Sequence, residues 1–526
     1  MIRAVRNLGR AFAIVRILGR HGAAFVVDPL ALPGPARWAF AVAAGKAAAD
    51  AKDLRRGQRL AAAAQELGPS FIKLGQALST RPDIVGDDVA DDLSQLRDRL
   101  PPFAGSEARA MIEAQLEARV EEIFASFDDT PLAAASIAQV HAATLPGGGE
   151  VAVKVLRPGI EARFARDADF FQWVAEMLEW LRPDLRRLEP VKVVATFRAG
   201  IDAEMDLRLE AAAASELGEA FADDPDFRVP EIDWQRTQKR VMTAERVHGV
   251  PIGDRAALAA AGRDPDAVVR NVLTAFLRQA FRDGFFHADL HHGNLFVDEN
   301  NAVIAVDFGI MGRLDKLTRR FVAELLLAFL AGDYRRAAEI HFEAGYVPRG
   351  KSVEEFAQAC RSIGKPLFER PATDVSVARL LARLFEVTES FDMRTQPQLL
   401  LLQKTMMVVE GLCRSVAPHA DLWGIADEVL RDWATKNLGV QARAMDAAEE
   451  FAGAMRRIPR LVEQAELAAG AIAGDGVRIH PAVDEAMRNV RDGPRATGRR
   501  SAIPVNTVLF AVIAVLAVVL LTQLFG

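Results

Sequence analysis

One segment of the chain, FHADLHHGNLFVDENNAVIAVDFG at positions 286–309, concentrates the residues that could do chemistry. It contains three histidines, three aspartates and three asparagines in a chain otherwise rich in Ala, Leu and Val. His287, Asp289 and Asn294 form the pattern H-x-D-x-x-x-x-N, and Asp307 opens a downstream Asp-Phe-Gly triplet. Three kinds of site fit these residue types: a metal centre, a phosphate-transfer site or a polar turn.

Two apolar runs inside this segment, NLFV and AVIAV, flank the polar residues DENN and predict a β-hairpin. The hairpin would return Asp307 to the side of Asn294. Phosphoryl transfer from a nucleotide needs oxygen ligands for magnesium and a carboxylate that orients the nucleophile or accepts its proton. Asn294 and Asp307 fit as the metal ligands, and Asp289 fits as that carboxylate.

The lysine that ends VAVK, Lys154, closes an apolar run that predicts a strand, and the Gly-rich turn at 147–149 predicts a hairpin before it. A lysine held at a fixed place on a strand suits the binding of two nucleotide phosphates. Alone, such a lysine is usually a solvated side chain. VAVK, the histidine-aspartate loop and the Asp-Phe-Gly triplet follow one another in the order found in kinases, and together they predict a kinase-like site.

The histidines allow a second interpretation. His287, His291 and His292 together with Asp289 could bind a transition metal, because histidines four residues apart share one face of a helix. The following Gly-Asn pair and apolar run indicate a loop instead, and no further His or Cys lies close in sequence. We therefore expect the ring of His287 to bind backbone close to Asp307. His291 and His292 would contact substrate or face solvent.

The chain departs from ordinary protein kinases in three places. The Gly-rich nucleotide loop is replaced by PLAAASIAQVH, in which methyl groups occupy positions where backbone would approach phosphate. Ala288 stands where an arginine normally precedes the catalytic aspartate, so a phosphorylated activation loop lacks its usual partner. No Ala-Pro-Glu motif follows the Asp-Phe-Gly triplet. A protein kinase of the usual type is therefore disfavoured.

The composition is that of a globular protein with more than one packed unit: 526 residues, of which 50% are apolar and 26% charged. A formal charge of −6 gives no electrostatic reason to expect nucleic acid as a partner. The two cysteines, Cys360 and Cys413, lie far apart in sequence. They fit a reducing compartment and argue against a disulfide framework or a four-cysteine zinc site.

The C-terminal segment 505–525, VNTVLFAVIAVLAVVLLTQLF, carries no charge and as a helix would be about 30 Å long, the thickness of a bilayer core. Four arginines lie just before it, at positions 491, 495, 499 and 500. We expect a single C-terminal span in the inner (cytoplasmic) membrane, with the catalytic body on the cytoplasmic side.

At the N-terminal end, residues 1–20 alternate arginines with apolar residues at helical spacing. A basic helix on an anionic membrane surface and an ordinary solvated amphipathic helix fit this pattern equally.

These motifs resemble the UbiB (aarF-type) family of atypical kinases, which is linked to ubiquinone biosynthesis. The resemblance covers roughly residues 66–313 and includes the K-x-G-Q motif with Lys73 and Gln76, and the E-x-D element that starts at Glu204. The Ala-rich loop, VAVK, HADLHHGN and Asp-Phe-Gly complete it. Two differences stand out: Ala138 replaces glycine in S-I-G-Q-V-H, and one C-terminal span is expected where relatives often have two.

The resemblance implies an α+β, protein-kinase-like two-lobe fold that is predominantly helical, with a helical N-terminal extension and a C-terminal transmembrane helix. Composition along the chain then divides the sequence into six parts. These are a basic N-terminal arm (1–38), a helical K-x-G-Q-type extension (39–128), a kinase-like N-lobe (129–250), a kinase-like C-lobe with a helical C-terminal region (251–490), a basic linker (491–504) and a transmembrane anchor (505–525).

The resemblance also implies a role for each motif. Lys154 would pair with Glu204 beside the catalytic Asp289, and Asn294 and Asp307 would bind Mg²⁺. Lys73 and Gln76, with Glu210, would be regulatory, in an extension that folds over the cleft and blocks the place of a protein substrate. A self-packed helix pair is the alternative for that extension. The residues implied to bind the nucleotide are Ala133, Ala134, Ala135, Ser136, Lys154 and Glu245, the last of which could also be a surface glutamate at a strand end.

The function implied by the resemblance is a membrane-anchored, Mg-dependent ATPase or atypical kinase that supports ubiquinone biosynthesis. It would act on access to, or regulation of, polyprenyl-phenol intermediates and their enzymes. ATP and Mg²⁺ are the implied cofactors, and the implied partners are a membrane lipid or quinone precursor and other ubiquinone-biosynthesis enzymes. Two alternatives remain. The first is a small-molecule or lipid phosphotransferase, because HADLHHGN also resembles the loop of choline- and aminoglycoside-type phosphotransferases. The second is a non-catalytic membrane scaffold switched by nucleotide.

Overall fold

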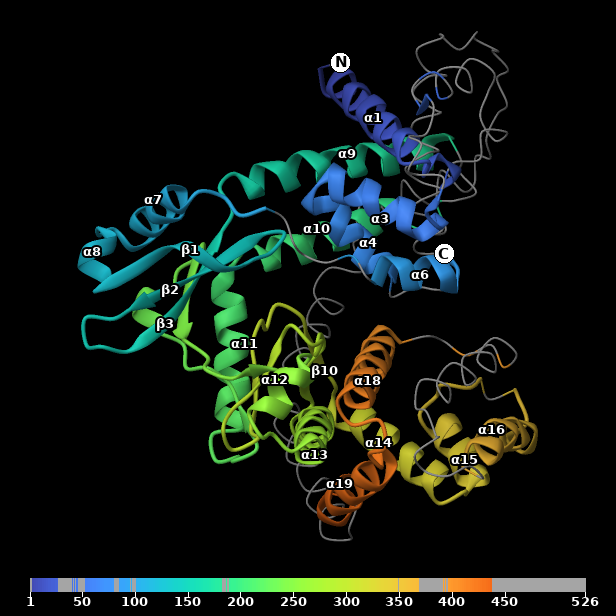
Figure 1. The fold of residues 1–526 in the computed structure, drawn as a ribbon. Coiled ribbons are helices and arrows are strands. Elements are labelled where there is room, and N and C mark those ends of the chain that lie inside the picture. Colours follow the sequence, from blue (N-terminus) through green and yellow to red (C-terminus); the bar gives the residue numbers. More distant parts are fainter. Residues whose placement is uncertain are drawn as a thin grey trace, which may run out of the picture.

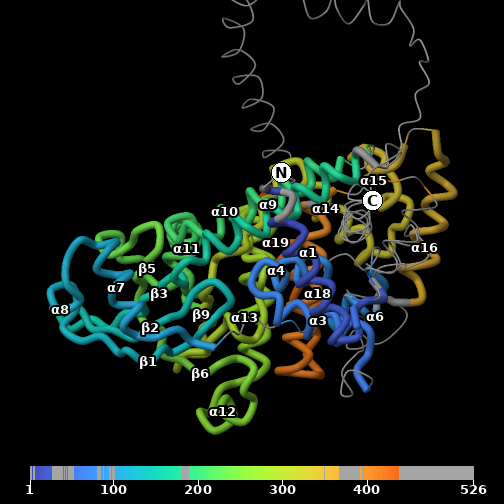
Figure 2. The backbone as a smooth tube through the Cα atoms, turned by 90° about the horizontal axis from the view of Figure 1, so that it is seen from above, coloured from blue at the N-terminus to red at the C-terminus, as the bar shows by residue number. Residues whose placement is uncertain are grey.

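The computed structural model describes residues 2–26, 53–79, 85–94, 101–181, 189–348, 350–368 and 396–437, with a few isolated residues between these ranges. These residues form two lobes and a group of N-terminal helices that packs on the smaller one (Figure 1). Figure 2 shows the sheet of the smaller lobe at one end of the molecule and helices α15 and α16 at the other. The described residues are mostly helical, as expected for this fold class.

The smaller lobe, or N-lobe, is built on an antiparallel sheet in the order β1-β2-β3-β5. Its elements are β1 (Ser126–Ala134), β2 (Ala138–Thr144), β3 (Glu150–Leu156), β5 (Val241–Glu245), α7 (Gly105–Leu116), α8 (Val120–Ile123) and α11 (Leu207–Ala220). Successive side chains of a strand point to opposite faces, so Val151, Val153 and Val155 pack together against α7 and α8. Lys154 lies on the other face, where α11 packs.

The hairpin predicted at residues 147–149 is confirmed, because these residues join β2 to β3 and Gly148 has a φ of +90°. The strand before this hairpin, β1, begins at Ser126, ahead of the N-lobe start predicted at residue 129. Proline fits inside β1 because this is the edge strand, and its pairing with β2 shifts register on both sides of Pro131.

The N-terminal helices share one apolar core with two helices inserted between β3 and α11. The N-terminal helices are α1 (Ile2–Arg20), α3 (Arg56–Leu67), α4 (Pro69–Ser79) and α6 (Asp87–Ser94), and the inserted helices are α9 (Ile160–Leu181) and α10 (Pro190–Glu204). Figure 1 shows α1, α3 and α4 beside α9 and α10. Packing on α9 excludes a pair of helices that contact only each other.

Helix α1 is amphipathic and packs on protein. Its buried residues include Ala11, Ile14, Val15 and Leu18. Arg3 binds Asp169 at 2.9 Å and Arg10 binds Asp167 at 2.7 Å, and both carboxylates belong to α9. The apolar face of this basic helix is therefore occupied by the protein itself, and part of its positive charge is bound to α9.

The larger lobe, or C-lobe, combines a sheet in the order β4-β9-β8-β6 with the strand pair β10-β7. Its strands are β4 (Phe227–Arg228), β6 (Val250–Pro251), β7 (Phe285–His287), β8 (Leu295–Val297), β9 (Val303–Ala305) and β10 (Met311–Arg313). Its helices are α12 (Arg255–Ala260), α13 (Pro265–Leu277), the π-helix η6 (Arg278–Asp283), α14 (Lys316–Leu330), α15 (Tyr334–Glu343), α16 (Val353–Phe368), α18 (Pro397–Val416) and α19 (Leu422–Asn437). The pairing of β8 with β9 confirms the hairpin predicted within residues 286–309.

The connection between the lobes differs from the prediction. The N-lobe predicted at residues 129–250 includes β4, yet β4 pairs in parallel with β9 of the C-lobe. Only Ile232 forms a bridge to Ala244 of β5. After β5 the chain returns, because β6 pairs with β8. Strands of two residues carry too little periodicity to be assigned to one sheet from sequence.

The predicted basic linker (491–504) and transmembrane anchor (505–525) lie outside the described residues, as does the end of the C-terminal helical region beyond residue 437. Among the residues that the structure describes, no helix combines the length and apolarity needed to cross a membrane.

Candidate active site

The centre of the site is Lys154, whose ammonium lies between carboxylates from the two lobes. Its Nζ atom donates to Glu210 Oε1 at 2.6 Å and to Asp307 Oδ1 at 2.9 Å. Glu210 lies in the first turn of α11, and Asp307 follows β9. The side chains of Lys154 and Glu210 are 13% and 8% exposed, whereas that of Asp307 is 50% exposed. One lysine therefore joins the lobes, with Asp307 on its open side.

Glu204 does not bind Lys154, so the predicted pair is wrong. Helix α10 ends at Glu204, and Asp206 caps the next helix by accepting a hydrogen bond from the N–H of Arg208. The two glutamates therefore belong to different helices, and Glu210 lies on the face of α11 turned to the sheet. Sequence spacing alone does not separate them, because the helix break between them decides which glutamate reaches the lysine strand.

Glu204 instead binds Lys73 of the K-x-G-Q motif, with Nζ and Oε2 2.9 Å apart. This contact ties α4 to the last residue of α10, and both side chains are largely buried. One turn later on α4, Gln76 donates to the carbonyl oxygen of Leu96 at 3.5 Å. The charge of Lys154 and, to a smaller extent, that of Lys73 lower the pKa of Asp307. The sequence indicated that Lys73 belongs to the site but did not identify its partner.

His287 has the structural role predicted for it. The ring is fully buried, Nδ1 accepts from the N–H of Asp289 at 3.1 Å, and Nε2 donates to the carbonyl oxygen of Val306 at 3.2 Å. These bonds require a neutral ring with its proton on Nε2, and burial lowers the pKa of His287 accordingly. The ring thus connects the catalytic loop to the residue that precedes the Asp-Phe-Gly triplet.

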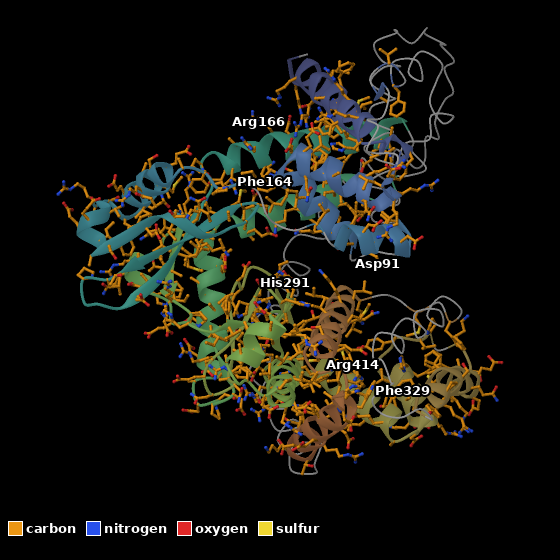
Figure 3. The ribbon with its side chains drawn as sticks, viewed as in Figure 1. Asp91, Phe164, Arg166, His291, Phe329 and Arg414 are labelled. Carbon is orange, nitrogen blue, oxygen red and sulfur yellow. The ribbon has the colours of Figure 1, made fainter. Side chains whose placement is uncertain are left out.

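His291 lies farther out and is half exposed. Its Nδ1 accepts from the N–H of Gly293 at 3.0 Å, and its Nε2 lies 3.8 Å from Asp289 Oδ2. Figure 3 shows His291 at the edge of the C-lobe that is turned toward the N-terminal helices. The predicted contact of His291 with substrate stays a prediction.

Asn294 organises the return of the hairpin. Its Nδ2 donates to the backbone carbonyl of Asp289 at 3.0 Å, which leaves Oδ1 as the ligand atom of the amide. The N–H of Val306 donates to the backbone carbonyl of Asn294 at 2.9 Å, so the chain comes back beside Asn294 as predicted. Asp307 then has a φ of +65°, a conformation that residues with side chains adopt rarely and that concentrates at functional sites.

Two carboxylates share one ammonium, and this sets their protonation. The charge of Lys154 holds the pKa of Asp307 well below its usual range. Burial raises the pKa of Glu210 to about 7, because the attraction of Lys154 is divided between two carboxylates. Burial alone would lower the pKa of Lys154, but Asp307 and Glu210 together raise it. Lys154 and Asp307 are therefore charged at neutral pH, and Glu210 is the group that titrates there.

The Ala-rich loop forms the tip of the β1–β2 hairpin. Ala133 and Ala134 end β1, and the N–H of Ala135 donates to the carbonyl oxygen of Ala138 at 2.8 Å, which closes a tight turn around Ser136. The side chain of Ser136 is fully buried, and its hydroxyl has no hydrogen-bond partner in the described part of the chain. Contact of these four residues with a nucleotide stays a prediction.

Strand pairing places this loop and Glu245 relative to Lys154. Val140 of β2 lies opposite Lys154, so the loop is at the end of the sheet just beyond the lysine. Glu245 ends β5, where the chain leaves the N-lobe sheet for the C-lobe, and it binds Arg228 at 2.5 Å. It therefore occupies the linker position expected for it, whereas its contact with an adenine stays a prediction.

The donor atoms of the site fit magnesium. Asn294 and Asp307 offer oxygen atoms, which Mg²⁺ prefers, and this metal usually completes its shell with phosphates and water. No cluster of three or more His, Cys, Asp or Glu side chains that could hold a metal ion occurs within the described ranges. Asn294 and Asp307 would supply two oxygen ligands of such a shell.

The chain is similar to known proteins over most of its length. The model of the ABC1 atypical kinase-like domain matches residues 95–341, and that of the UbiB helical domain matches residues 360–421. A protein named probable protein kinase UbiB from Marinobacter nauticus is 45% identical over 82% of this chain and 80% of its own length. One of the same name from Azotobacter vinelandii is 43% identical over 78% and 77%. The chain belongs to the UbiB family.

The two family models match consecutive parts of the C-lobe. The first ends within α15 and contains all the predicted catalytic and metal-binding residues, while the second begins within α16 and ends just before α19. Lys73 and Gln76 precede both matches.

A solved structure, the complex of Rv3197 with erythromycin from Mycobacterium tuberculosis, is similar at a TM-score of 0.49 and 25% identity, over 69% of this chain and 93% of that one.

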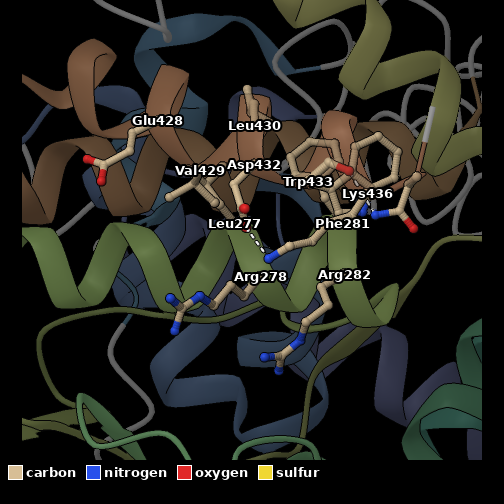
Figure 4. A pocket seen from close by; sticks show the side chains of 11 residues that line it. Leu277, Arg278, Phe281, Arg282, Glu428, Val429, Leu430, Asp432, Trp433 and Lys436 are labelled. Carbon is tan, nitrogen blue, oxygen red and sulfur yellow. Dashed lines mark hydrogen bonds and ion pairs between the residues drawn. The ribbon is translucent and has the colours of Figure 1, made fainter. Parts of the chain in front are cut away.

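A cavity of about 460 Å³ opens elsewhere on the C-lobe, between α13 with η6 and α19 (Figure 4). The rings of Phe281 and Trp433 lie in its wall with centroids 6.3 Å apart, and the side chain of Lys436 lies beside them. None of the predicted site residues lines it. This cavity is therefore separate from the candidate active site.

Proposed function

We propose that this UbiB-family protein is a membrane-anchored, Mg-dependent ATPase or atypical kinase that supports ubiquinone (coenzyme Q) biosynthesis. The observation that carries the proposal is the position of Lys154 between Glu210 of the N-lobe and Asp307 of the C-lobe. Kinase-type phosphoryl transfer uses a strand lysine held by a helix glutamate, and a carboxylate in Asp-Phe-Gly that binds magnesium. The chain brings these three groups together from positions far apart in sequence.

In this proposal each residue of the site has one task. Lys154 binds phosphate oxygens of ATP, and the buried Glu210 holds its ammonium in place. Asn294 and Asp307 hold Mg²⁺, which neutralises charge on the phosphates. Asp289, kept in position by its backbone bonds to His287 and Asn294, orients the attacking nucleophile or accepts its proton.

The contact of Lys73 with Glu204 supports a regulatory task for the K-x-G-Q helix. Because this contact brings α4 beside the site, we assign α4 the task of limiting the access of protein substrates. Water or a lipid-associated molecule is then the favoured acceptor. A single span at residues 505–525 would hold the catalytic body on the cytoplasmic side of the inner membrane, where polyprenyl-phenol intermediates and the enzymes that modify them meet.

The proposal is tested with purified full-length protein, radiolabelled ATP, Mg²⁺ and liposomes, with and without a quinone precursor. Release of free phosphate that depends on Mg²⁺ and rises with the precursor is the expected result, and Asp289→Asn should abolish it. Label transferred to lipid or to a small molecule would identify a phosphotransferase instead. Absence of both products would overturn the assigned activity.

A separate experiment addresses the nucleotide-switched scaffold. Asp307→Asn weakens the proposed magnesium site, so this variant should fail to restore growth of a strain that lacks its own quinone-biosynthesis kinase. The wild-type chain expressed at the same level is the control. Full complementation by the variant would favour a scaffold that needs no phosphoryl transfer.

A further inference from the structure

The Ala-rich loop is held in place by Arg157, the residue that follows β3. Its Nε and Nη2 atoms donate to the carbonyl oxygen of Ala135 at 3.0 and 2.8 Å. Its Nη1 atom donates to the carbonyl oxygen of Pro101 at 2.9 Å, and the guanidinium lies over the ring of Phe103, 5.6 Å from the centroid. The backbone N–H of Arg157 donates to Ile137 at 2.8 Å. One residue therefore fixes both the loop and the segment that leads to α7.

The bond to Ala135 determines the direction of the next amide group. A trans peptide is planar, so its carbonyl and its N–H point to opposite sides, and the described chain contains no cis peptide bond. Because the carbonyl of Ala135 is turned toward Arg157, the N–H of Ser136 points away from Arg157. No hydrogen-bond acceptor among the described residues binds this N–H.

The hydroxyl of Ser136 is a second donor without a partner on the same residue. It is fully buried and forms no hydrogen bond within the described part of the chain. Buried polar groups in proteins are nearly always bonded, and an exception calls for an explanation. In kinases the β1–β2 loop covers the nucleotide phosphates. Two donors on one residue at the tip of this loop match the oxygens of a phosphate.

The alanines explain why such a loop needs support. A Gly-rich loop can change its backbone conformation to meet phosphate, whereas alanine is excluded from most of the conformations open to glycine. Donors on an Ala-rich loop must therefore already point in the correct direction before the nucleotide binds. A guanidinium that makes two bonds to a single carbonyl supplies this rigidity.

We propose that Arg157 is a positioning residue for the nucleotide phosphates: by binding the carbonyl of Ala135 it orients the amide and hydroxyl of Ser136 toward a phosphate oxygen. The inference rests on the proposed binding of ATP and goes beyond it, because no recognised motif contains Arg157. Its effect is specific to the phosphates and does not extend to the nucleoside.

The test compares Mg–ADP with adenosine as ligands of the full-length protein, by calorimetry and by competition. Arg157→Met should weaken Mg–ADP on the order of tenfold, the loss expected for one hydrogen bond to a charged group. It should leave the affinity for adenosine nearly unchanged, although the lost bonds to Ala135 and Pro101 should lower the melting temperature somewhat. Arg157→Lys, which keeps one donor group, should retain part of the affinity for Mg–ADP. Ser136→Ala should weaken Mg–ADP, and combining it with Arg157→Met should cost less than the product of the two losses.

Gln139 supplies a matched control. Its side chain binds both backbone groups of Phe103, at 3.1 and 3.3 Å, but makes no bond to the Ala-rich loop. Gln139→Met therefore loosens the same segment without freeing Ala135, and the ratio of Mg–ADP to adenosine affinity should not change. A similar loss in this variant, or an equal loss of both ligands in Arg157→Met, would show general loosening and overturn the inference.

The outcomes separate the inference from the proposed function. A wild-type protein that binds Mg–ADP, with an Arg157→Met variant of the same affinity, overturns the role of Arg157 alone. A wild-type protein that binds neither Mg–ADP nor Mg–ATP overturns the proposed function, and the inference with it. Selective loss of Mg–ADP in the Arg157 variant supports both.

Discussion

Two lysine–glutamate pairs involve the same short stretch of chain, residues 204–210. Lys154 comes from the sheet and binds Glu210 together with Asp307 of the other lobe, whereas Lys73 comes from the N-terminal helices and binds Glu204. Glu210 is 8% exposed and Glu204 is 23% exposed. A deeply buried pair leaves an uncompensated charge when one member is removed, while water can solvate the members of an outer pair. Glu210 is thus the more deeply buried of the two glutamates, and we expect the outer pair to open more readily than the inner pair.

The largest effect is expected from Lys154→Ala. Without the ammonium, Mg²⁺ alone would neutralise the phosphates and no cation would separate Glu210 from Asp307, so turnover should be abolished. Phosphate release measures the activity, and a thermal melt checks the fold. Because the pKa of Glu210 lies near 7, this carboxyl can take up a proton and spare the protein a buried charge. Gross unfolding of the variant would identify Lys154 as a structural residue instead.

The matched pair Glu210→Gln and Glu204→Gln tests the comparison directly. Glu210→Gln releases Lys154 from its inner partner and should lower kcat on the order of 10- to 100-fold. Glu204→Gln leaves the bonds of Lys154 in place and should change kcat by no more than a few fold. It should, however, increase labelling of the protein itself, because α4 is then free to move. Equal losses in the two variants would contradict the assignment of separate roles.

The protonation of Glu210 predicts a dependence of stability on pH. The pKa of Glu210 is raised from 4.5 to about 7 by burial, so its contribution is fully present below 4.5 and is lost as pH rises through about 7. The loss that corresponds to this rise is roughly 3 kcal/mol. The thermal midpoint of the wild type should therefore fall, relative to Glu210→Gln, between pH 5 and 8. The lowered pKa of Asp307 acts in the opposite sense and only in more acidic solution, below its ordinary value of 3.8. Parallel midpoints across this window would refute the titration of Glu210.

The smallest effect is expected on the loop side of Lys154. Ala135→Gly gives the loop back its conformational freedom and should change nucleotide affinity by a few fold or permit autophosphorylation. Binding of Mg–ADP and labelling from ATP measure the two quantities. Unchanged values of both would show that alanine at this position does not restrain the loop.

Local patterns predicted two hairpins and the role of His287 correctly. The hairpins at 147–149 and at β8–β9 follow from apolar runs around polar or Gly-rich turns, and the second of them returns Asp307 to the side of Asn294. The structural role of His287 was also predicted, because a loop histidine close to a returning strand meets backbone carbonyls. These are contacts between residues that are close in sequence or joined by one turn.

Contacts between residues that are far apart in sequence were not predicted. The partner of Lys154 depends on a helix break at residues 205–206, and the partner of Lys73 depends on how α4 packs against α10. Arg157 gave no signal at all, because an arginine after a strand is usually solvated. Such contacts are decided by packing, which composition and periodicity do not encode.

The chain passes between the two lobes twice, and this affects how the lobes are joined. Two segments, 229–231 and 246–249, run between β4 and β6 of the C-lobe sheet and the β5 region of the N-lobe, and Arg228 bridges to Glu245 beside them. Helix α11 joins the lobes as well, because Ala214 and Leu217 pack in the core of the C-lobe and Glu216 binds Arg313. The bond of Lys154 to Asp307 is a further link between the lobes, and it crosses the site itself. A ligand that replaces Asp307 at Lys154 removes this link, so we expect bound phosphates to loosen the two lobes at the site while α11 keeps them joined.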